Sequence, residues 1–259
     1  MLAARTPTHA LRRSLRTWLG VARSVRIYYG SRHRMRQMTA LYQRFVKPGD
    51  LVFDIGSHVG DRIAAFHRLG ARVVAVEPQP AAFRLLKAFY GRRSGVTLVH
   101  AAASEHPGTL TLRLNLANPT ISTASTAFID AAQDASGWEG QQWEESIEVP
   151  AVTLDELIAV HGLPAFAKID VEGFELEVLK GLSQPLPALS FEFTTIQRDL
   201  AEACAARLMT LGAYRFNVAL GESQELGFAG TVNADELLAY LQSLPHSANS
   251  GDVYALLSR

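Results

Sequence analysis

Short apolar segments of strand character alternate with helical segments through most of the 259-residue chain. The strand-like segments lie at residues 51–55, 72–77, 96–100, 166–170 and 188–193. The helical segments lie at residues 59–69, 80–90, 153–160, 174–181 and 197–211. Strands that alternate with helices of this length form a parallel sheet with helices on both faces. The sequence therefore predicts a doubly wound, Rossmann-like α/β fold built on a mostly parallel, seven-stranded sheet.

Two further pairs of segments are predicted to form antiparallel strands. "TLTLRL" (109–114) alternates in polarity, and "SIEVPAV" (146–152) is its expected partner. "AYRFNVAL" (213–220) and "DVYALLSR" (252–259) are expected to form a hairpin at one edge of the sheet. We predict no strong helix between the members of this last pair.

The first 46 residues are predicted to form a basic helical extension ahead of a domain at residues 47–259. Eleven of the 25 Lys and Arg residues precede Asp50 and no acid does, which leaves 14 bases against all 25 acids in the rest of the chain. The helical pattern of the extension has an apolar face and a basic face. The apolar face carries Leu11, Leu15, Trp18, Leu19, Ala22 and Val25, and the basic face carries Arg12, Arg16, Arg23 and Arg26.

Three roles are open for this extension: a helical cover packed on the domain, an anchor on an anionic membrane surface, or a nucleic-acid contact. We expect no nucleic-acid partner, because no recognition motif accompanies the charge. No segment is apolar over a length that could span a membrane. The single cysteine, Cys204, is expected to be buried and fits a reducing compartment. We therefore expect a cytoplasmic protein, peripheral to a membrane if the extension is an anchor, although an arginine-rich start is also typical of organelle transit peptides.

The segment "VFDIGSHVGD" places an acid at the end of the first strand and two glycines in the loop after it. Gly56 and Gly60 permit a sharp turn and a close approach of the backbone to a ligand. A dinucleotide site would need a third glycine, and Asp54 would repel a pyrophosphate. Asp54 suits an ammonium group instead, and Glu77, at the end of the second strand, suits two ribose hydroxyls. These two groups together describe S-adenosylmethionine; the simpler interpretation is that Asp54 caps the helix and the glycines only make a turn.

In this order, "VFDIGSHVGD", "VVAVEPQP", "AAAS", "VTLDEL" and "KIDVEGFELEVLKG" resemble the motifs of the FkbM family of S-adenosylmethionine-dependent methyltransferases. The resemblance covers about residues 50–195 and implies a class I methyltransferase fold. It also implies cofactor contacts from Asp54, Gly56, Gly60 and Glu77, with Ala102 and Ser104 near the adenine. Many members have Ala-Asn where this chain has Ser57-His58. We predict that Ser57 and His58 contact the cofactor, with a role for His58 at the acceptor as the alternative.

Carboxylates gather where the strand "FAKID" ends and the next helix begins. A hydroxyl that accepts a methyl group must lose its proton, either to a base or with the help of a bound metal. Asp170, Glu172 and His58 are the predicted catalytic residues, and Asp170 is the one we expect to be most needed. Glu192 is a further candidate base, and Asp170, Glu172 and Glu192 are alternatively oxygen ligands of Mg²⁺. Glu175 is expected only to stabilise the N-terminus of the helix.

Residues 115–145 fit no regular element, and a long insert in a compact domain is usually functional or disordered. One interpretation is a lid over the acceptor, in which Trp138 and Trp143 offer flat surfaces to a sugar ring. The other is a surface loop whose tryptophans pack onto the core.

The combined prediction is an S-adenosylmethionine-dependent O-methyltransferase that acts on a hydroxyl of a small molecule or glycan. Two other classes stay open. A nicotinamide-dependent (NAD) oxidoreductase shares the fold, but the missing glycine and Asp54 count against it. A catalytically inactive S-adenosylmethionine-binding protein would explain the departure at Ser57 and His58.

Overall fold

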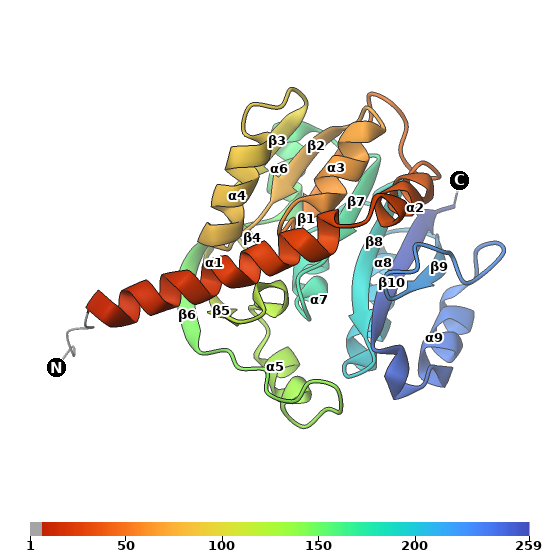
Figure 1. Cartoon of the computed structure of the whole chain (residues 1–259). Helices are drawn as coiled ribbons and strands as arrows, with labels where there is room; N and C mark the ends of the chain where they lie inside the picture. Colours follow the sequence, from red (N-terminus) through yellow and green to blue (C-terminus); the bar gives the residue numbers. More distant parts are fainter. Residues whose placement is uncertain (1–6, 259) are drawn as a thin grey trace.

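The computed structural model describes residues 7–258, and among them the side chains of residues 16–258. Its centre is a seven-stranded sheet with the strand order β3-β2-β1-β7-β8-β10-β9 (Figure 1). The strands are β1 (Leu51–Ile55), β2 (Arg72–Val76), β3 (Val96–Val99), β7 (Phe166–Ile169), β8 (Ala188–Thr194), β9 (Tyr214–Leu220) and β10 (Ser250–Leu257). β10 runs antiparallel to both of its neighbours, and every other pairing in this sheet is parallel. The predicted doubly wound fold with a mostly parallel seven-stranded sheet is confirmed.

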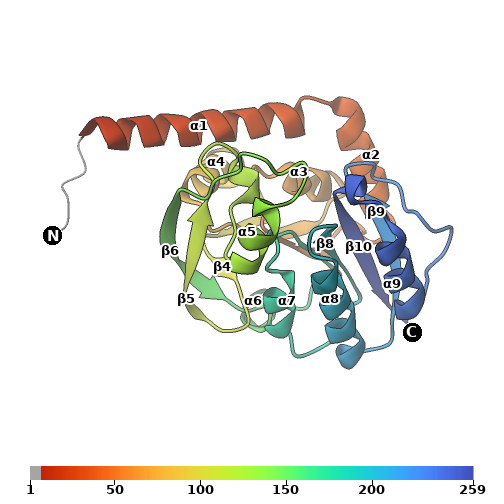
Figure 2. The same cartoon turned by 90° about the horizontal axis from the view of Figure 1, so that it is seen from below.

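Helices cover both faces of this sheet (Figures 1 and 2). One face packs against α2 (Arg32–Tyr42), α3 (Asp61–Arg68) and α4 (Pro80–Tyr90). The other packs against α6 (Leu154–His161), α7 (Glu175–Lys180), α8 (Arg198–Leu211) and α9 (Ala234–Ser243). All residues of β1 and β7 are buried, as expected for central parallel strands that are covered on both sides. Cys204 is fully buried in the core under α8, which confirms its expected burial.

A second, three-stranded sheet lies beside the first and has the order β4-β6-β5. β5 (Gly108–Leu114) pairs antiparallel with β6 (Glu145–Val152), so the predicted pairing of these two segments is confirmed. The short strand β4 (Ala102–Ala103) adds to β6 in parallel. Two residues of the "AAAS" motif thus form an edge strand of the second sheet.

The expectation that residues 115–145 form no regular element is wrong. The segment contains the 3₁₀ helix η1 (Pro119–Ile121) and the helix α5 (Thr126–Gln133). The Ser125 hydroxyl caps α5 by accepting a hydrogen bond from the Phe128 amide, 3.0 Å away. Hydroxyl-rich sequence here supplies a helix cap, which composition alone does not distinguish from a loop.

The C-terminal strands also differ from the expectation. β9 and β10 do pair antiparallel, but α9 lies between them in the chain. Asn233 and Glu236 form a capping box at the start of α9, with both reciprocal hydrogen bonds 2.8 Å long. The antiparallel pair does lie at one edge of the sheet, with β9 outermost and β10 between β9 and β8, so only the expected absence of a helix between them is wrong.

The N-terminal segment forms two helices, α1 (Pro7–Tyr29) and α2, separated by a bend at Gly30 and Ser31. α2 is part of the core, where Met38 and Tyr42 pack with residues of β1, α3 and β7. α1 runs along the outside of the body and extends beyond it (Figure 2). The division of the chain at residue 46 stays a prediction. Over the described residues, no helix is long and apolar enough to cross a membrane.

The predicted apolar face of α1 is wrong for its middle part. Val21 and Ser24 are buried, whereas Trp18, Leu19 and Ala22 are exposed. Gly20 decides this orientation, because a Cβ there would lie 2.6 Å from Cδ of Pro119 in η1, so only glycine lets the helix approach so closely. The side chains of Leu11, Arg12 and Leu15 lie outside the described residues.

Candidate functional site

The loop after β1 is held in a tight turn by residues with positive φ. Gly56, His58 and Gly60 have φ of 82°, 45° and 85°. A Cβ on Gly56 would collide with the carbonyl oxygen of Asp170, so this glycine lets the loops after β1 and β7 touch. A Cβ on Gly60 would lie 2.7 Å from Leu86 in α4. The glycines thus bring three elements together around the carboxyl ends of the strands.

Glu77 follows β2 and is buried, with both carboxylate oxygens hydrogen-bonded to backbone amides. Oε2 accepts from the His58 amide and Oε1 from the Gln79 amide, each at 2.8 Å. Burial raises the pKa of Glu77 to about 7, against the lowering effect of these two hydrogen bonds. Each oxygen keeps a lone pair for a further donor, such as a ligand hydroxyl.

Asp54, the last polar residue of β1, is fully buried, and neither of its carboxylate oxygens has a hydrogen-bond partner among the described residues. Burial raises its pKa to about 7. The interpretation that Asp54 caps the following helix is wrong, because α3 begins after Gly60 with no side-chain cap. An unpaired buried carboxylate is costly, so it points to a ligand that the chain itself does not supply.

Ser57 and His58 face different surroundings. The Ser57 hydroxyl donates to the backbone carbonyl of Asp54 at 2.8 Å, so this side chain shapes the turn. Both ring nitrogens of His58 are buried and have no partner among the described residues. Its ring meets the edge of Tyr28 from α1, with the ring centres 5.9 Å apart. Burial lowers the pKa of His58 to about 4, so the ring is neutral near pH 7.

Most of the predicted site residues line one pocket. Its volume is about 520 Å³ when the open mouth is included. Residues of the predicted site that line it are Gly56, His58, Glu77, Ala102, Asp170 and Glu172. Asp54, Ser57, Gly60 and Ser104 do not line it. The amide of Ser104 donates to the carbonyl of Val152 at 2.9 Å, so Ser104 belongs to the join between β4 and β6.

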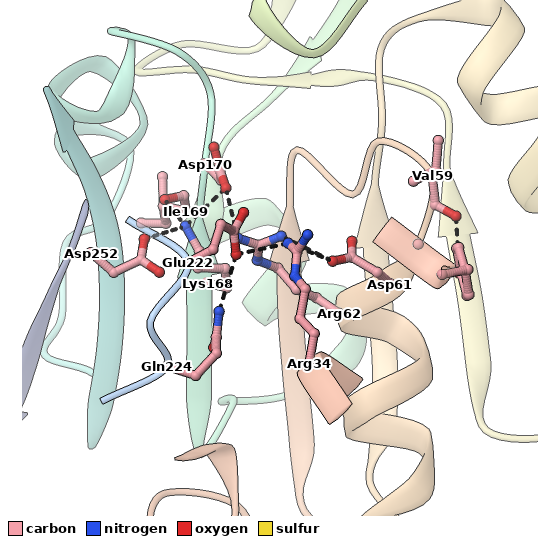
Figure 3. A network of polar contacts seen from close by, with 12 residues as sticks. Arg34, Val59, Asp61, Arg62, Lys168, Ile169, Asp170, Glu222, Gln224 and Asp252 are labelled. Atoms are coloured by element: carbon pink, nitrogen blue, oxygen red, sulfur yellow. Dashed lines mark hydrogen bonds and ion pairs between the residues drawn. The ribbon is translucent and has the colours of Figure 1, made fainter. Parts of the chain in front are cut away.

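Asp170, which follows β7, is held as an anion by the buried Lys168 and the half-buried Arg62 (Figure 3). Nζ of Lys168 lies 3.1 Å from Oδ2 of Asp170, and Nη2 of Arg62 lies 3.4 Å from the same oxygen. Burial alone would raise the pKa of Asp170, but the two cations outweigh it and hold the pKa at about 2. Asp170 is therefore a fixed negative charge and a poor proton acceptor at neutral pH.

These cations belong to a larger charged network that sequence inspection missed (Figure 3). Lys168 also binds Oδ1 of Asp252 at 2.8 Å. Arg62 lies 3.4 Å from Asp61, which is in turn 3.8 Å from Arg34 of α2. Arg34 then binds Glu222, in the loop after β9, at 2.7 Å. A signal was present in the sequence, since Lys168 is a charge inside the otherwise apolar strand "FAKI".

The register of the sheet explains how this row of charges forms. Asp54 of β1 is paired with Lys168 of β7, and Glu192 of β8 with Asp252 of β10. Paired residues in adjacent strands point to the same face of a sheet. Four neighbouring strands therefore present a charged residue near their ends, on the face that α2 and α3 cover.

Asp170, Glu172 and Glu192 form a cluster in which one carboxylate oxygen of each lies within 4.8 Å of the others. The pKa of Glu172 is raised well above its usual value by burial and then by Asp170 and Glu175. The pKa of Glu192 is raised in the same way by burial and then by Glu172 and Asp170. Glu175 accepts a hydrogen bond from the Val171 amide at 2.9 Å, which confirms its expected place at the N-terminus of α7.

The insert between β5 and β6 closes one side of the pocket. Thr120, Ser122 and Ala124 line the pocket, and the Thr123 hydroxyl donates to the carbonyl of Glu172 at 2.6 Å.

The two tryptophans of the insert lie elsewhere. Trp138 and Trp143 pack around Phe128 of α5, with ring centres 5.3 and 6.2 Å from the phenyl ring. Neither lines the pocket, so they offer it no flat surface, and both pack within the insert on Phe128 of α5.

Comparison with known proteins finds a matching family model and two curated relatives. The model of the family described as the methyltransferase FkbM domain matches residues 54–244. The hexuronic acid methyltransferase AglP of Haloferax volcanii is 28% identical over 163 residues, which are 62% of this chain and 62% of AglP. The 31-O-demethyl-FK506 methyltransferase FkbM of Streptomyces tacrolimicus is 30% identical over 161 residues, 53% of this chain and 61% of that protein. The matches thus span less than two thirds of the length of these curated relatives.

Among solved structures, the TehB-like SAM-dependent methyltransferase of Corynebacterium glutamicum resembles this chain with a TM-score of 0.48. The two are 11% identical, and the similarity covers 98% of this chain and 100% of that one. The resemblance that the sequence motifs carry is confirmed by the family model, which matches well over half of the chain. This protein belongs to the FkbM methyltransferase family.

Proposed function

We propose that the protein is an S-adenosylmethionine-dependent methyltransferase that modifies a hydroxyl oxygen of a small molecule, with a sugar as the leading acceptor class. The observation that carries this proposal is the single pocket shared by Glu77, at the end of β2, and Asp170, at the end of β7. Ligands of doubly wound sheets bind at this edge. The names of the relatives, one acting on a hexuronic acid and one on a 31-O-demethyl compound, support an oxygen acceptor on a small molecule.

The residues present fit the cofactor. Glu77 has acceptor capacity left for ribose hydroxyls, and Ala102 supplies an apolar wall suited to the adenine. The buried, unpaired carboxylate of Asp54 suits the ammonium end of the cofactor in its chemistry, but it lies behind the pocket wall rather than in it. The unpaired ring of His58 lines the pocket and offers one donor and one acceptor in its neutral form.

When bound, S-adenosylmethionine supplies a methyl group on a sulfonium, which is already an activated leaving group. The protein therefore mainly has to align the acceptor with the methyl group and to promote loss of the hydroxyl proton. Asp170 is fixed as an anion by Lys168 and Arg62, so it orients the acceptor rather than accepting its proton. Glu172, which also lines the pocket, and Glu192 next to it are the other acidic groups on the acceptor side.

Calorimetry with the purified protein tests the cofactor. We expect S-adenosylmethionine and S-adenosylhomocysteine to bind, and NADH not to bind. Binding of NADH alone would replace the proposal with an oxidoreductase.

Asp170→Asn tests the acceptor side. The variant should still bind the cofactor in calorimetry but lose methyl transfer to a panel of sugars and glycosides, followed with a radiolabelled methyl group. Methyl transfer by the variant at the unaltered rate would remove Asp170 from the mechanism.

We also infer that α1 contacts an anionic membrane surface, in addition to packing on the domain. Its outer face combines the exposed Leu19 and Ile27, 61% and 51% accessible, with the exposed Arg23 and Arg26. Apolar and basic side chains on one helix face suit the boundary between lipid headgroups and acyl chains. The acceptor would then be one that is presented near a membrane.

A further inference from the structure

We propose that Asp170, Glu172 and Glu192 bind one hard divalent cation, and that this cation holds the acceptor oxygen for methylation. The inference deepens the proposed function and rests on it for the acceptor. The three residues come from the end of β7, the loop after it and β8, so the fold gathers them from two adjacent strands.

The spacing of the three carboxylates fits one ion. One oxygen from each lies within 4.8 Å of the other two. A cation with oxygen ligands at about 2.1 Å, as for Mg²⁺, or about 2.4 Å, as for Ca²⁺, puts opposite ligands about 4.2 to 4.8 Å apart. Oxygen-only ligand sets suit Mg²⁺, Mn²⁺ and Ca²⁺ rather than zinc. Small side-chain adjustments would therefore complete the site.

Among the described residues, the two cations beside the cluster form ion pairs with one of its three carboxylates, that of Asp170. Glu172 is only 7% exposed, and its carboxylate has no hydrogen bond or ion pair among the described residues. Oε2 of Glu192 is buried and has no hydrogen-bond partner among the described residues, while the Glu192 carboxyl also hydrogen-bonds the side chain of Asp170. Lys168 and Arg62 both contact Oδ2 of Asp170, and neither forms an ion pair with the glutamates. As anions, the buried Glu172 and the half-buried Glu192 beside a third carboxylate are costly unless a cation compensates them.

The position of the cluster would place the cation next to the acceptor. Asp170 and Glu172 line the pocket that also contains Glu77, so an ion between them would border the acceptor. Three protein ligands leave coordination positions for water and for an acceptor oxygen. In the transfer, the acceptor O–H bond breaks with its proton passing to water, and the oxygen forms a bond to the methyl carbon. The C–S bond of the cofactor breaks and its electron pair stays on sulfur.

The test begins with binding of Mn²⁺ alone to full-length protein freed of metal with a chelator. Free Mn²⁺ is measured by electron paramagnetic resonance, and we expect one bound ion per chain. Glu192→Gln and Glu172→Gln should each weaken this binding at least tenfold. The matched control is Glu175→Gln. Glu175 is buried, like Glu172, but it accepts a hydrogen bond from the Val171 amide, so the affinity of this variant for Mn²⁺ should be unchanged.

Competition with Mg²⁺ and Ca²⁺ then identifies which ion the site prefers. Absence of bound Mn²⁺, or equal binding by the two glutamine variants and the unaltered chain, would overturn the site. Circular dichroism of each variant checks that it is folded. If the unaltered chain binds S-adenosylmethionine and transfers methyl at full rate in excess chelator, the cation has no catalytic role while the proposed function stands. Lack of cofactor binding would instead count against the proposed function, and the Mn²⁺ titration would still decide the site.

Discussion

Lys168 is fully buried in the middle of the sheet and is shared by the carboxylates of Asp170 and Asp252. Lys168→Met would leave both carboxylates without their common cation. Removing one partner from a buried charge pair typically costs about 3–5 kcal/mol of unfolding free energy. Urea denaturation of the variant should show a loss of this size.

Lys180→Met is the control for this measurement, because Lys180 lies on the surface of α7 and pairs only with Glu177. It should change the unfolding free energy by less than about 0.5 kcal/mol. Equal stability of Lys168→Met and Lys180→Met would show that the buried network is not needed for folding.

The two carboxyls assigned to the cofactor predict how its binding depends on pH. Burial raises the pKa of both Glu77 and Asp54 to about 7, so each is largely protonated below that pH and anionic above it. As an anion, Glu77 accepts hydrogen bonds from the ribose hydroxyls, and Asp54 forms an ion pair with the ammonium group. Cofactor affinity measured by calorimetry should therefore rise, by about tenfold between pH 6 and pH 8 if one of the two groups controls binding, and then level off.

Glu77→Gln and Asp54→Asn should each bind the cofactor more weakly and show a flatter pH profile. An affinity of the unaltered chain that is constant from about pH 6 to pH 8 would contradict the assignment of these carboxyls.

At the scale of elements, α1 combines a packed face with a free face. Tyr29 ties it to the domain, because its hydroxyl lies 2.7 Å from that of Tyr90 in α4. Trp18 is 40% exposed and has the Arg84 guanidinium over its ring at 5.6 Å. Periodicity predicted the helix correctly, but not which face turns inward, since that depends on the approach of Gly20 to η1.

The membrane proposal for α1 predicts the behaviour of a double variant. Leu19→Glu with Ile27→Glu should reduce co-sedimentation with anionic vesicles several-fold, because it replaces exposed apolar side chains by charges that anionic lipid repels. The control is Val160→Glu, since Val160 is 74% exposed on α6, away from α1. Equal sedimentation of the double variant and the control would exclude α1 as the contact.

At the scale of the whole molecule, the N-terminal segment and the domain share one core through α2. Met38 is buried there together with residues of β1, α3 and β7. Met38→Ala should lower the unfolding free energy by about 2–5 kcal/mol, as expected for a cavity in a packed core. A single cooperative thermal transition at lower temperature, followed by circular dichroism, is the expected result. A loss below about 0.5 kcal/mol would mean that α2 is only loosely attached.

Sequence patterns were enough to predict the alternation of strands and helices, the parallel sheet, the pairing of β5 with β6 and the glycine turn beside Glu77. These follow from periodicity and turn chemistry, which act between residues close in the chain. The sequence also predicted that Asp170 would face the site, because the carboxyl ends of parallel strands meet at one edge.

Contacts between residues far apart in the chain could not be predicted from these patterns. The insertion of β10 between β8 and β9 brings Asp252 to Lys168, and the bend after α1 brings Arg34 to Glu222. The same packing makes Asp170 a fixed anion and leaves Glu172 unpaired. Such charges depend on which partners burial places within a few ångströms, and local sequence patterns do not contain that information.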